Sequence, residues 1–575
     1  MADFSNKNLK DLSPEELLDL CERLREKIKR TVLQKGGHLS SNLGVIELTV
    51  ALHYVFDFPA DKLIFDVGHQ CYAHKLLSGR EMQFDTLRQR GGISGFPKRE
   101  ESEYDCYNTG HAGTSVSAAL GFAMARDISG DDYNVIAVIG DGSFNNGLIY
   151  EAFNSLRPLN TNILVILNDN GMSISPTVGS MHEYLEQLSR DDMHRKKVEK
   201  HSNIFERFGF SYDGVYDGND LGAMIEKLRE VKEKLKTQSV ILHIATKKGK
   251  GYTFCEDNPQ QSHGITVGSA GYVSYSKVFG ETLTELAEKD EKIVAVTAAM
   301  TPSLGLSQFF EKFPRRSIDV GICEEHATIL CAALAAQGLK PYYAVYSTFL
   351  QRSFDEIIID ICSQNLPVTL CIDRAGISGD DGETHQGVFD LSFLNLIPNI
   401  TVAVPKDSNE LKKMIAASAS FNAPLAIRYP KECKRVFESS SDFELTKWEY
   451  LTHGNCGIAV LACGERAIDV ALAANGRLGN GLSVTVVNAR CVKPLDKDFI
   501  ENLNENIIVT VEDNQLLGGF GSSICSYFAD NVKVRVKNFA YSDTFIPHGT
   551  VEELMDEFGL NCSEITKYIL KNAVR

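Results

Sequence analysis

Short apolar runs alternate with segments of helical apolar spacing along much of the chain. In one such stretch the runs Val135–Ile139 and Ile163–Leu167 flank residues 147–156, whose apolar positions recur with helical spacing. This pattern predicts a strand, a helix and a second strand that form a parallel crossover unit. The two runs end in the polar tips Gly140-Asp141-Gly142 and Asn168-Asp169-Asn170. Ligands of such units bind beyond the carboxyl ends of the strands, so both tips are candidate site residues.

The alternation continues toward the C-terminus, and polar segments without periodicity interrupt it. Further strands are predicted at residues 240–246, 293–296, 317–320, 342–345, 368–372, 400–404, 458–461, 483–487 and 507–511. Residues 13–35 and the charged segment 183–235 are predicted to be helical, and residues 255–275 and 432–450 to be linkers. We therefore expect an α/β protein of three doubly wound domains with mainly parallel sheets, covering residues 1–265, 272–432 and 450–575.

Composition narrows the class of protein. A chain of 575 residues is too long for one core, and contents of 43% hydrophobic and 23% charged residues are ordinary for a soluble globular protein. The net charge of −17 argues against nucleic acid as a partner. The fourteen cysteines are scattered without a CxxC pair, which favours reduced thiols over disulfides or zinc. The polar, acidic start and the lack of a long apolar run predict a cytoplasmic protein without a membrane anchor.

Asp141 and Asn170 each follow a predicted strand directly. Their side-chain oxygens are ligands that suit Mg²⁺, which often completes its coordination with the phosphate oxygens of a ligand. A lone GDG is usually only a tight turn. Here Asp141 of the GDG and Asn170 of the NDN tip lie 29 positions apart. A GDG followed at this spacing by an NDN tip is the signature of enzymes that bind thiamine diphosphate.

Other candidate groups lie in loops and at strand ends. His38, His69 and His111 each lie close to glycine in loops before predicted helices, which favours an imidazole-lined pocket over three solvated loop residues. Glu324 lies at a strand-to-helix junction among apolar residues, an unusual place for a carboxylate without a task. The glycine-rich stretch Leu517–Gly521 resembles an anion loop, although helix packing is the simpler interpretation.

Together these motifs closely resemble the 1-deoxy-D-xylulose-5-phosphate synthase family, a branch of the transketolase-like thiamine enzymes, over nearly the whole chain. The stretches that carry the resemblance are GGHLSSNLGVIELTVALHYVF, DVGHQCYAHKLLSGR, GDG…NDN…MSISP, GICEEHA, YSTFLQRSFDEIIID, DRAGISGDDGETHQGVFDLSFL, IRYP and EDNQLLGGFGS. Transketolase proper shares the cofactor half of this pattern but lacks YSTFLQR and DRAG…GDDGETHQG.

The resemblance implies a transketolase-like architecture with thiamine diphosphate and Mg²⁺ as cofactors. By position, Asp141, Asn170 and the backbone carbonyl of Met172 would hold Mg²⁺, and Glu324 would pair with the ring nitrogen of the aminopyrimidine. Other implied cofactor contacts are His69, Gly110, His111, Gly140, Gly142, Ser143, Lys248 and Phe349, and His263 corresponds to a further residue of this region.

The implied reaction joins pyruvate, with loss of CO₂, to D-glyceraldehyde 3-phosphate and gives 1-deoxy-D-xylulose 5-phosphate. In the family this is the first step of the non-mevalonate isoprenoid precursor pathway, and its product also feeds thiamine and pyridoxal biosynthesis. The resemblance assigns catalytic roles to Glu324, His38, His69, His111, Asp381 and His385, and substrate contacts to His38, Tyr346, Arg352, Arg374, Asp381, His385 and Arg428.

The resemblance also implies a homodimer, with neither nucleic acid nor a membrane as partner. Two other interpretations stay open: ketol transfer between sugar phosphates of the transketolase type, and a non-catalytic paralogue that binds thiamine diphosphate. The chain departs from the family pattern at Gly171, where an acidic residue is common, at Asn145-Asn146, in a shortened segment 180–205, and in the stretch HGITVGS. These departures bear on the lid over the site and on acceptor preference.

Overall fold

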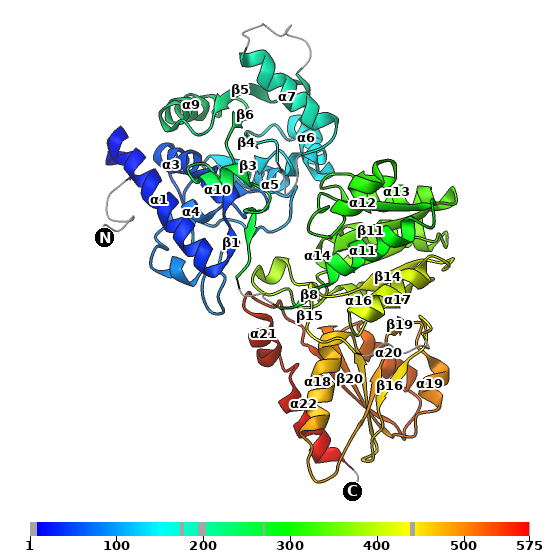
Figure 1. Cartoon of the computed structure of the whole chain (residues 1–575). Helices are drawn as coiled ribbons and strands as arrows, with labels where there is room; N and C mark the ends of the chain where they lie inside the picture. Colours follow the sequence, from blue (N-terminus) through cyan, green and yellow to red (C-terminus); the bar gives the residue numbers. More distant parts are fainter. Residues whose placement is uncertain (1–8, 173–176, 194–202, 268–270, 438–442, 574–575) are drawn as a thin grey trace. The chain divides into compact units, whose positions relative to one another are not determined.

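A computed structural model describes the chain except for residues 1–8, 173–176, 194–202, 268–270, 438–442 and 574–575 (Figure 1). The chain divides into two compact units, Met1–Ser269 with Gly321–Cys323 and Ala270–Val320 with Glu324–Arg575. The bounds of the three predicted domains stay predictions. Within the described residues, no helix combines the length and apolar character needed to cross a membrane.

The first unit is built on a five-stranded parallel sheet in the order β2-β3-β4-β6-β5. Its strands are β2 (Lys62–Phe65), β3 (Val135–Gly140), β4 (Leu164–Asp169), β5 (Ser211–Asp217) and β6 (Val240–Ala245). The register runs from Ile136 opposite Leu164 to Gly140 opposite Asn168, and helix α6 (Gly147–Leu159) connects the two strands. The predicted crossover unit is therefore confirmed, and both polar tips lie at the same edge of the sheet.

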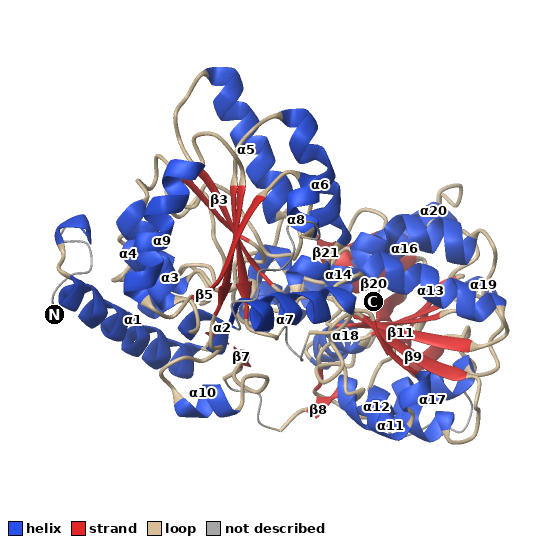
Figure 2. Cartoon of the chain, turned by 90° about the horizontal axis from the view of Figure 1, so that it is seen from above, coloured by secondary structure: helices blue, strands red, loops and turns tan. Residues whose placement is uncertain are grey.

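Alternate residues of β3 pack on opposite faces of this sheet. Ile136 and Val138 belong to a core with helices α1, α3, α4 and α9, whereas Ala137 and Ile139 pack with α5 and α6. Figure 2 shows these two groups of helices on either side of the strands. The helices of the unit are η1 (Leu9–Asp11), α1 (Pro14–Lys35), α2 (Ser40–Leu43), α3 (Ile46–Val55), α4 (Tyr72–Leu77), η2 (Gln83–Thr86), α5 (Ser115–Ser129), η3 (Ser143–Asn145), α6, α7 (Ser180–Met193), α8 (Ile204–Phe208), α9 (Leu221–Lys234) and α10 (Thr253–Asp257).

Two expectations for this unit are wrong. Residues 183–235 include the edge strand β5 as well as helices, because a polar, partly exposed edge strand lacks the apolar signature of an inner strand. The predicted linker 255–275 contains part of α10 and the short strand β7 (Gly264–Ile265), which pairs with β1 (Gly37–His38). This pairing brings residue 263 beside residue 38. The predicted linker 432–450 includes residues 438–442, which lie outside the described residues.

The second unit contains two larger sheets. The seven-stranded sheet has the order β10-β9-β11-β12-β14-β13-β19, parallel except for β19, and the five-stranded sheet has the order β16-β18-β17-β20-β21, parallel except for β16. The strands are β8 (Val273–Ser274), β9 (Ile293–Thr297), β10 (Ser317–Asp319), β11 (Lys340–Tyr346), β12 (Thr369–Asp373), β13 (Thr401–Ala403), β14 (Leu425–Arg428), β15 (Glu432–Cys433), β16 (Glu449–Thr452), β17 (Ile458–Cys463), β18 (Thr485–Asn488), β19 (Cys491–Lys493), β20 (Ile507–Gln515) and β21 (Arg535–Tyr541).

Strand β19 follows β18 of one sheet in the chain but pairs with β13 of the other. The two sheets of this unit are thus joined by backbone hydrogen bonds and by a buried ion pair between Arg490 and Glu410, whose Nε and Oε1 atoms are 2.7 Å apart. The helices are α11 (Tyr275–Ala287), α12 (Ser307–Lys312), η4 (Pro314–Arg316), α13 (Glu324–Ala336), α14 (Ser347–Leu350), η5 (Gln351–Ser353), α15 (Phe354–Glu356), η6 (Ile357–Cys362), η7 (Gly382–Thr384), α16 (Asp390–Leu396), α17 (Ser408–Ser418), α18 (Glu465–Gly476), α19 (Lys497–Glu501), α20 (Phe520–Tyr527), α21 (Val551–Glu557) and α22 (Cys562–Asn572).

Candidate active site

Asp141 lies directly after β3 and is 1% exposed. Thr177 Oγ1 donates a hydrogen bond of 2.6 Å to Asp141 Oδ2, and the backbone N–H of Asn170 approaches Oδ1 at 3.4 Å. Burial and, to a smaller extent, the neighbouring carboxylate of Asp169 raise the pKa of Asp141 to about 7. Since buried carboxylates are stabilised by a cation, this corner of the first unit suits a bound metal ion. Thr177 joins the candidate site through its bond to Asp141, and the sequence analysis did not identify it.

The second tip folds into a tight turn after β4. Asn170 Oδ1 accepts a hydrogen bond of 3.1 Å from the N–H of Met172, and Asp169 Oδ1 accepts one of 3.1 Å from Gly171. Gly171 has a φ of +70°, a left-handed conformation that glycine adopts without strain. The amide oxygen of Asn170 keeps a second lone pair for a cation.

Lys248 lies close enough to both Asp141 and the imidazole of His263 to interact with them electrostatically. It is 7% exposed, and its charge acts on both Asp141 and His263. Burial lowers the pKa of Lys248 to about 8, while Asp141 acts in the opposite direction. An ammonium group in this place could bind a phosphate oxygen of a ligand.

Three histidine rings meet in the first unit. The ring centroids of His38 and His69 are 5.3 Å apart, and that of His263 lies 5.4 Å from His38 and 5.3 Å from His69. Burial, assisted by the charge of Lys248, holds the pKa of His263 well below its usual value, so this imidazole is neutral at neutral pH. The predicted cluster therefore includes His38 and His69, and the pairing of β7 with β1 adds His263 to it.

The loop that carries His111 is tied to the turn before His69. Asp66, buried after β2, accepts hydrogen bonds of 2.9 Å from Gly113 N and 3.0 Å from Ser115 N. Val67 has a φ of +59°, a strained conformation for a β-branched residue, and such strain concentrates at functional sites. Gly110 and His111 lie in this same loop, and the place of the His111 ring relative to the other three stays a prediction.

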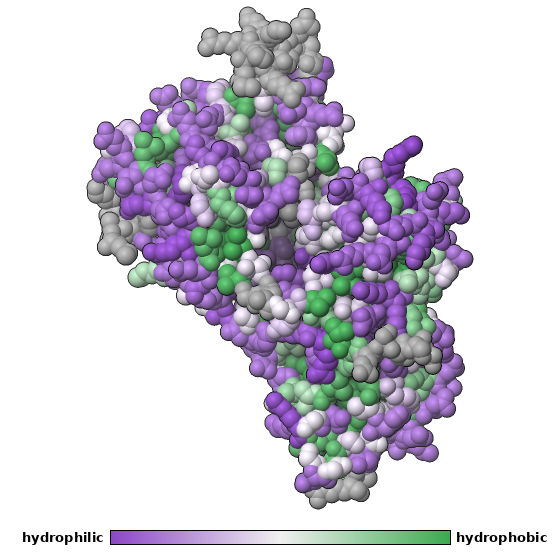
Figure 3. Space-filling view, in the orientation of Figure 1, coloured by the Kyte–Doolittle hydropathy of each residue, from purple (hydrophilic) through white to green (hydrophobic). Residues whose placement is uncertain are grey.

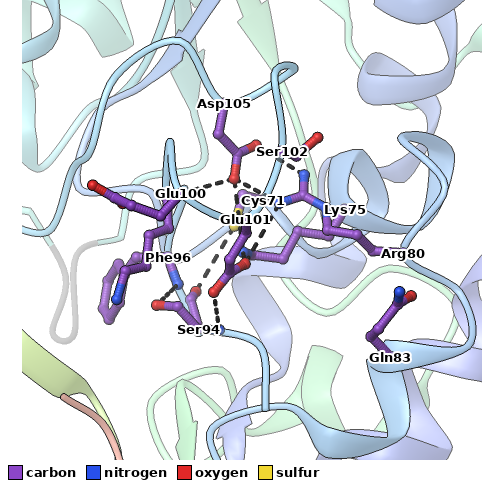
Figure 4. A network of polar contacts seen from close by, with 12 residues as sticks. Cys71, Lys75, Arg80, Gln83, Ser94, Phe96, Glu100, Glu101, Ser102 and Asp105 are labelled. Carbon is purple, nitrogen blue, oxygen red and sulfur yellow. Dashed lines mark hydrogen bonds and ion pairs between the residues drawn. The ribbon is translucent and has the colours of Figure 1, made fainter. Parts of the chain in front are cut away.

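Figure 4 shows a network of polar contacts that includes Lys75, Arg80, Glu101 and Asp105. Arg80 donates to both carboxylate oxygens of Asp105 at 2.6 and 2.8 Å, and Lys75 Nζ donates to Glu101 at 2.7 Å. Glu101 in turn accepts a bond of 2.6 Å from Ser94 N, at the start of the loop that carries Phe96. The Phe96 ring meets the His38 ring edge-on at 5.8 Å. The network thus anchors one wall of the imidazole cluster to α4.

In the second unit Glu324 begins α13 and is 3% exposed. Its Oε2 atom is buried and makes no hydrogen bond to any described residue, and Nη1 of Arg352 lies 4.0 Å away. Burial, opposed in part by the charge of Arg352, raises the pKa of Glu324 to about 7. A buried carboxyl that is half protonated near neutral pH can donate a proton to a ring nitrogen or accept one from it.

Four other predicted site residues of the second unit form a continuous stack. The Arg374 guanidinium lies 4.3 Å from the centre of the Tyr346 ring, Tyr346 stacks on Phe349 at 5.7 Å, and Phe349 meets His385 edge-on at 5.7 Å. Thr348 Oγ1 donates to Thr384 O at 2.8 Å, which joins α14 to the turn η7 that Asp381 precedes. The tertiary fold therefore brings together two of the stretches that carry the resemblance, YSTFLQR and DRAGISGDDGETHQG.

Arg428 is placed differently from these residues. It is 3% exposed, and its Nε donates to Asp390 Oδ2 at 2.9 Å while Nη2 donates to the carbonyl oxygen of Asp513 at 3.1 Å. These contacts join β14 to α16 and β20. Its implied role in substrate binding stays a prediction.

Two further sequence signals have structural explanations. In the glycine-rich stretch before α20, the N–H groups of Phe520 and Gly521 donate to the buried carboxylate of Glu512 at 2.7 and 2.8 Å. These two N–H groups therefore bind a side chain of the protein itself instead of an anionic ligand. Asn146 caps α6 by accepting from Leu148 N at 3.1 Å. Gly140, Gly142 and Ser143 flank Asp141 in the chain, and their contacts with a cofactor stay predictions.

Comparisons with known proteins agree with these motifs. A family described as 1-deoxy-D-xylulose-5-phosphate synthase matches residues 4–203 and 188–246, the transketolase pyrimidine binding domain matches residues 272–435, and the transketolase C-terminal domain matches residues 447–565. The 1-deoxy-D-xylulose-5-phosphate synthase of Caldanaerobacter subterraneus is 46% identical over 98% of this chain and 97% of its own length. That of Carboxydothermus hydrogenoformans is 44% identical over 96% of each chain.

A solved structure, transketolase from Campylobacter jejuni, is 19% identical over 97% of this chain and all of its own, with a TM-score of 0.47. The assignment comes from the sequence matches, which extend through the cofactor, pyrimidine and C-terminal regions. The chain therefore belongs to the 1-deoxy-D-xylulose-5-phosphate synthase family, whose members are transketolase-like, thiamine diphosphate-dependent transferases.

Proposed function

We propose that this protein condenses pyruvate with D-glyceraldehyde 3-phosphate, with loss of CO₂, to give 1-deoxy-D-xylulose 5-phosphate. The observation that carries this proposal is the Glu324 carboxyl group, which is buried at the start of α13. Its Oε2 accepts no hydrogen bond from any described residue, and its pKa is about 7. A carboxyl group in that state suits a hydrogen bond to the ring nitrogen of an aminopyrimidine.

The donor set of the first unit fits a diphosphate group with Mg²⁺. Asp141 and Asn170 offer oxygen ligands at one sheet edge, and the Met172 carbonyl follows them in the chain. Lys248 offers a cation beside Asp141 for a diphosphate oxygen. When bound, thiamine diphosphate supplies the nucleophilic carbon and the electron sink for decarboxylation.

The chain's own residues would bind, orient and exchange protons. Glu324 holds or releases one proton at Oε2. The neutral ring of His263 can accept a proton, and His38 and His69, whose rings lie beside it, are the proposed partners of the substrate oxygens. His111, Asp381 and His385 remain proposed catalytic groups from the resemblance.

The stack that Arg374 forms with Tyr346, Phe349 and His385 is suited to binding an anionic substrate. Arg374 is held over Tyr346 and paired with Asp373 at 2.9 Å, which fixes one edge of its guanidinium. A guanidinium group fixed in this way is suited to bidentate binding of a phosphate or carboxylate. Arg352 and Arg428 complete the proposed substrate set.

We also propose a cytoplasmic homodimer without a nucleic-acid or membrane partner. The homodimer rests on the family resemblance, and the net charge of −17 argues against a nucleic-acid partner. Light scattering should then give a mass of twice 63.6 kDa.

The proposed reaction is tested with purified protein, Mg²⁺, thiamine diphosphate, pyruvate and D-glyceraldehyde 3-phosphate. We expect CO₂ release and a phosphosugar with the mass of 1-deoxy-D-xylulose 5-phosphate. Ketol transfer from a sugar phosphate without CO₂ release would identify a transketolase. Cofactor binding by calorimetry without turnover in either assay would identify a non-catalytic paralogue.

A further inference from the structure

Asn42 lies in the short helix α2 and is completely buried. Its Nδ2 donates one hydrogen bond of 2.7 Å to the carbonyl oxygen of His38 and another of 2.7 Å to the carbonyl oxygen of His69. Its Oδ1 accepts a bond of 2.8 Å from the N–H of Tyr72. One amide group thus binds the backbone of both histidines and the first residue of α4.

These partners fix the orientation of the amide. Two carbonyl oxygens require the NH₂ group, and a backbone N–H requires the oxygen, so a flipped amide would lose all three bonds. The Tyr72 hydroxyl adds a second connection, because it accepts a bond of 3.2 Å from His38 N. Both N–H groups and the oxygen of the Asn42 amide are therefore hydrogen-bonded.

Regular secondary structure does not join the two histidines. His38 ends the two-residue strand β1, whereas His69 lies in the turn between β2 and α4. Their rings are nevertheless only 5.3 Å apart. A backbone displacement on either side of Asn42 would change that spacing directly.

We propose that Asn42 is a positioning residue that sets the spacing and orientation of the His38 and His69 imidazoles. Its effect on turnover rests on the function proposed above. Its effect on the two rings concerns the chain alone and is measurable without cofactor or substrate.

The test compares Asn42→Asp with Ser239→Ala. Aspartate has the shape of asparagine but lacks the two N–H donors, so it turns carboxylate oxygens toward two carbonyl oxygens. Ser239 is the matched control: it is 3% exposed and also bridges backbone groups, donating to Thr161 O and accepting from Ile163 N at 3.1 Å each. It lies at the amino ends of the strands, opposite the Asp141 tip.

The first readout is NMR of the full-length apoprotein labelled at histidine Cε1, with the two signals assigned from His38→Gln and His69→Gln. We expect Asn42→Asp to move the His38 and His69 signals and to leave those of His53 and His74 in place. Ser239→Ala should move none of these signals. The second readout is steady-state kinetics of the holoenzyme, where Asn42→Asp should lower kcat by at least about tenfold and change the KM for pyruvate much less.

Unchanged His38 and His69 signals in Asn42→Asp would overturn the proposal, whatever happens to kcat. Moved signals with kcat unaltered would overturn its catalytic part. If Asn42→Asp does not fold, Asn42→Ser, which keeps one donor and one acceptor, takes its place with the same criteria. If the wild type has no synthase activity, the proposed function fails while the NMR comparison still decides the role of Asn42.

Discussion

Nη1 of Arg352 lies 4.0 Å from Oε2 of Glu324, close enough for electrostatic attraction but too far for a hydrogen bond. The carboxyl group is thus buried beside a cation that does not saturate it, and its pKa of about 7 reflects burial more than the attraction. Near neutral pH Glu324 is therefore about half protonated, and its Oε2 atom is available for a hydrogen bond.

We expect Glu324→Gln to bind thiamine diphosphate and to turn over at least about 100-fold more slowly, because an amide cannot exchange a proton with the pyrimidine ring. Calorimetry and CO₂ release measure the two effects. Glu512→Gln is the control, since Glu512 is equally buried with a pKa of about 7 but binds the start of α20. Equal turnover in wild type and Glu324→Gln would refute the role assigned to Glu324.

The raised pKa of Glu324 also predicts a pH dependence of stability. Because the folded-state pKa, about 7, exceeds the ordinary value of 4.5, the wild-type apoprotein loses stability as the pH rises through this interval. The loss from this one group is about 3 kcal/mol. Glu324→Gln carries no charge, so its Tm relative to wild type should rise between about pH 4.5 and pH 8. A pH-independent Tm difference would contradict the raised pKa.

We expect the network of Lys75, Arg80, Glu101 and Asp105 to contribute strongly to the free energy of unfolding. Asp105→Asn removes the anion that pairs with Arg80 and accepts from His74 Nε2 at 3.1 Å, and we expect it to cost about 3–5 kcal/mol in urea denaturation. Asp19→Asn is the control, because its pair with Arg23 is exposed and should contribute at most about 1 kcal/mol. Similar losses in both variants would show that burial of the Asp105 network does not matter.

Arg428→Lys separates the structural from the substrate-binding role of this residue. Lysine cannot reproduce the simultaneous bonds to Asp390 and Asp513 O, so we expect a stability loss of about 2–4 kcal/mol. Thermal unfolding measures it, and the KM for D-glyceraldehyde 3-phosphate is recorded in parallel. A raised KM with an unchanged Tm would favour substrate binding over the structural role.

Asp141→Asn tests the proposed metal ligand. We expect the Mg²⁺ concentration for half-maximal activity to rise by at least about tenfold, because a neutral amide replaces the only charged ligand proposed. Asp217→Asn, at the carboxyl end of β5 in the same sheet, is the control and should leave the Mg²⁺ requirement unchanged. An unaltered requirement in Asp141→Asn would exclude Asp141 as a ligand.

Local patterns predicted most of the inner strands, although they missed the short buried strand β14, and they also predicted the edge strand β10. The inner strands β3 and β4 are continuous apolar runs, because both of their faces are buried, and such runs are visible in the sequence. The edge strand β5 is half-exposed and polar, and β19 pairs with a strand of another sheet. An exposed strand such as β5 lacks the apolar pattern that predicts a strand. The partner of β19 cannot be predicted from local pattern because it is distant in the chain.

The sequence by itself determined the α/β class, the family and the residue types of the site, because motifs such as GDG…NDN and GICEEHA combine chemistry and local structure in a few neighbouring residues. Only the tertiary structure decided that β7 brings His263 to His38, that Asn42 binds the loops of His38 and His69, and that Arg374, Tyr346, Phe349 and His385 stack in that order. The physical reason is that these contacts join segments far apart in the chain. Hydrogen bonds and ring contacts between such segments depend on the packing of the whole unit, which local periodicity does not encode.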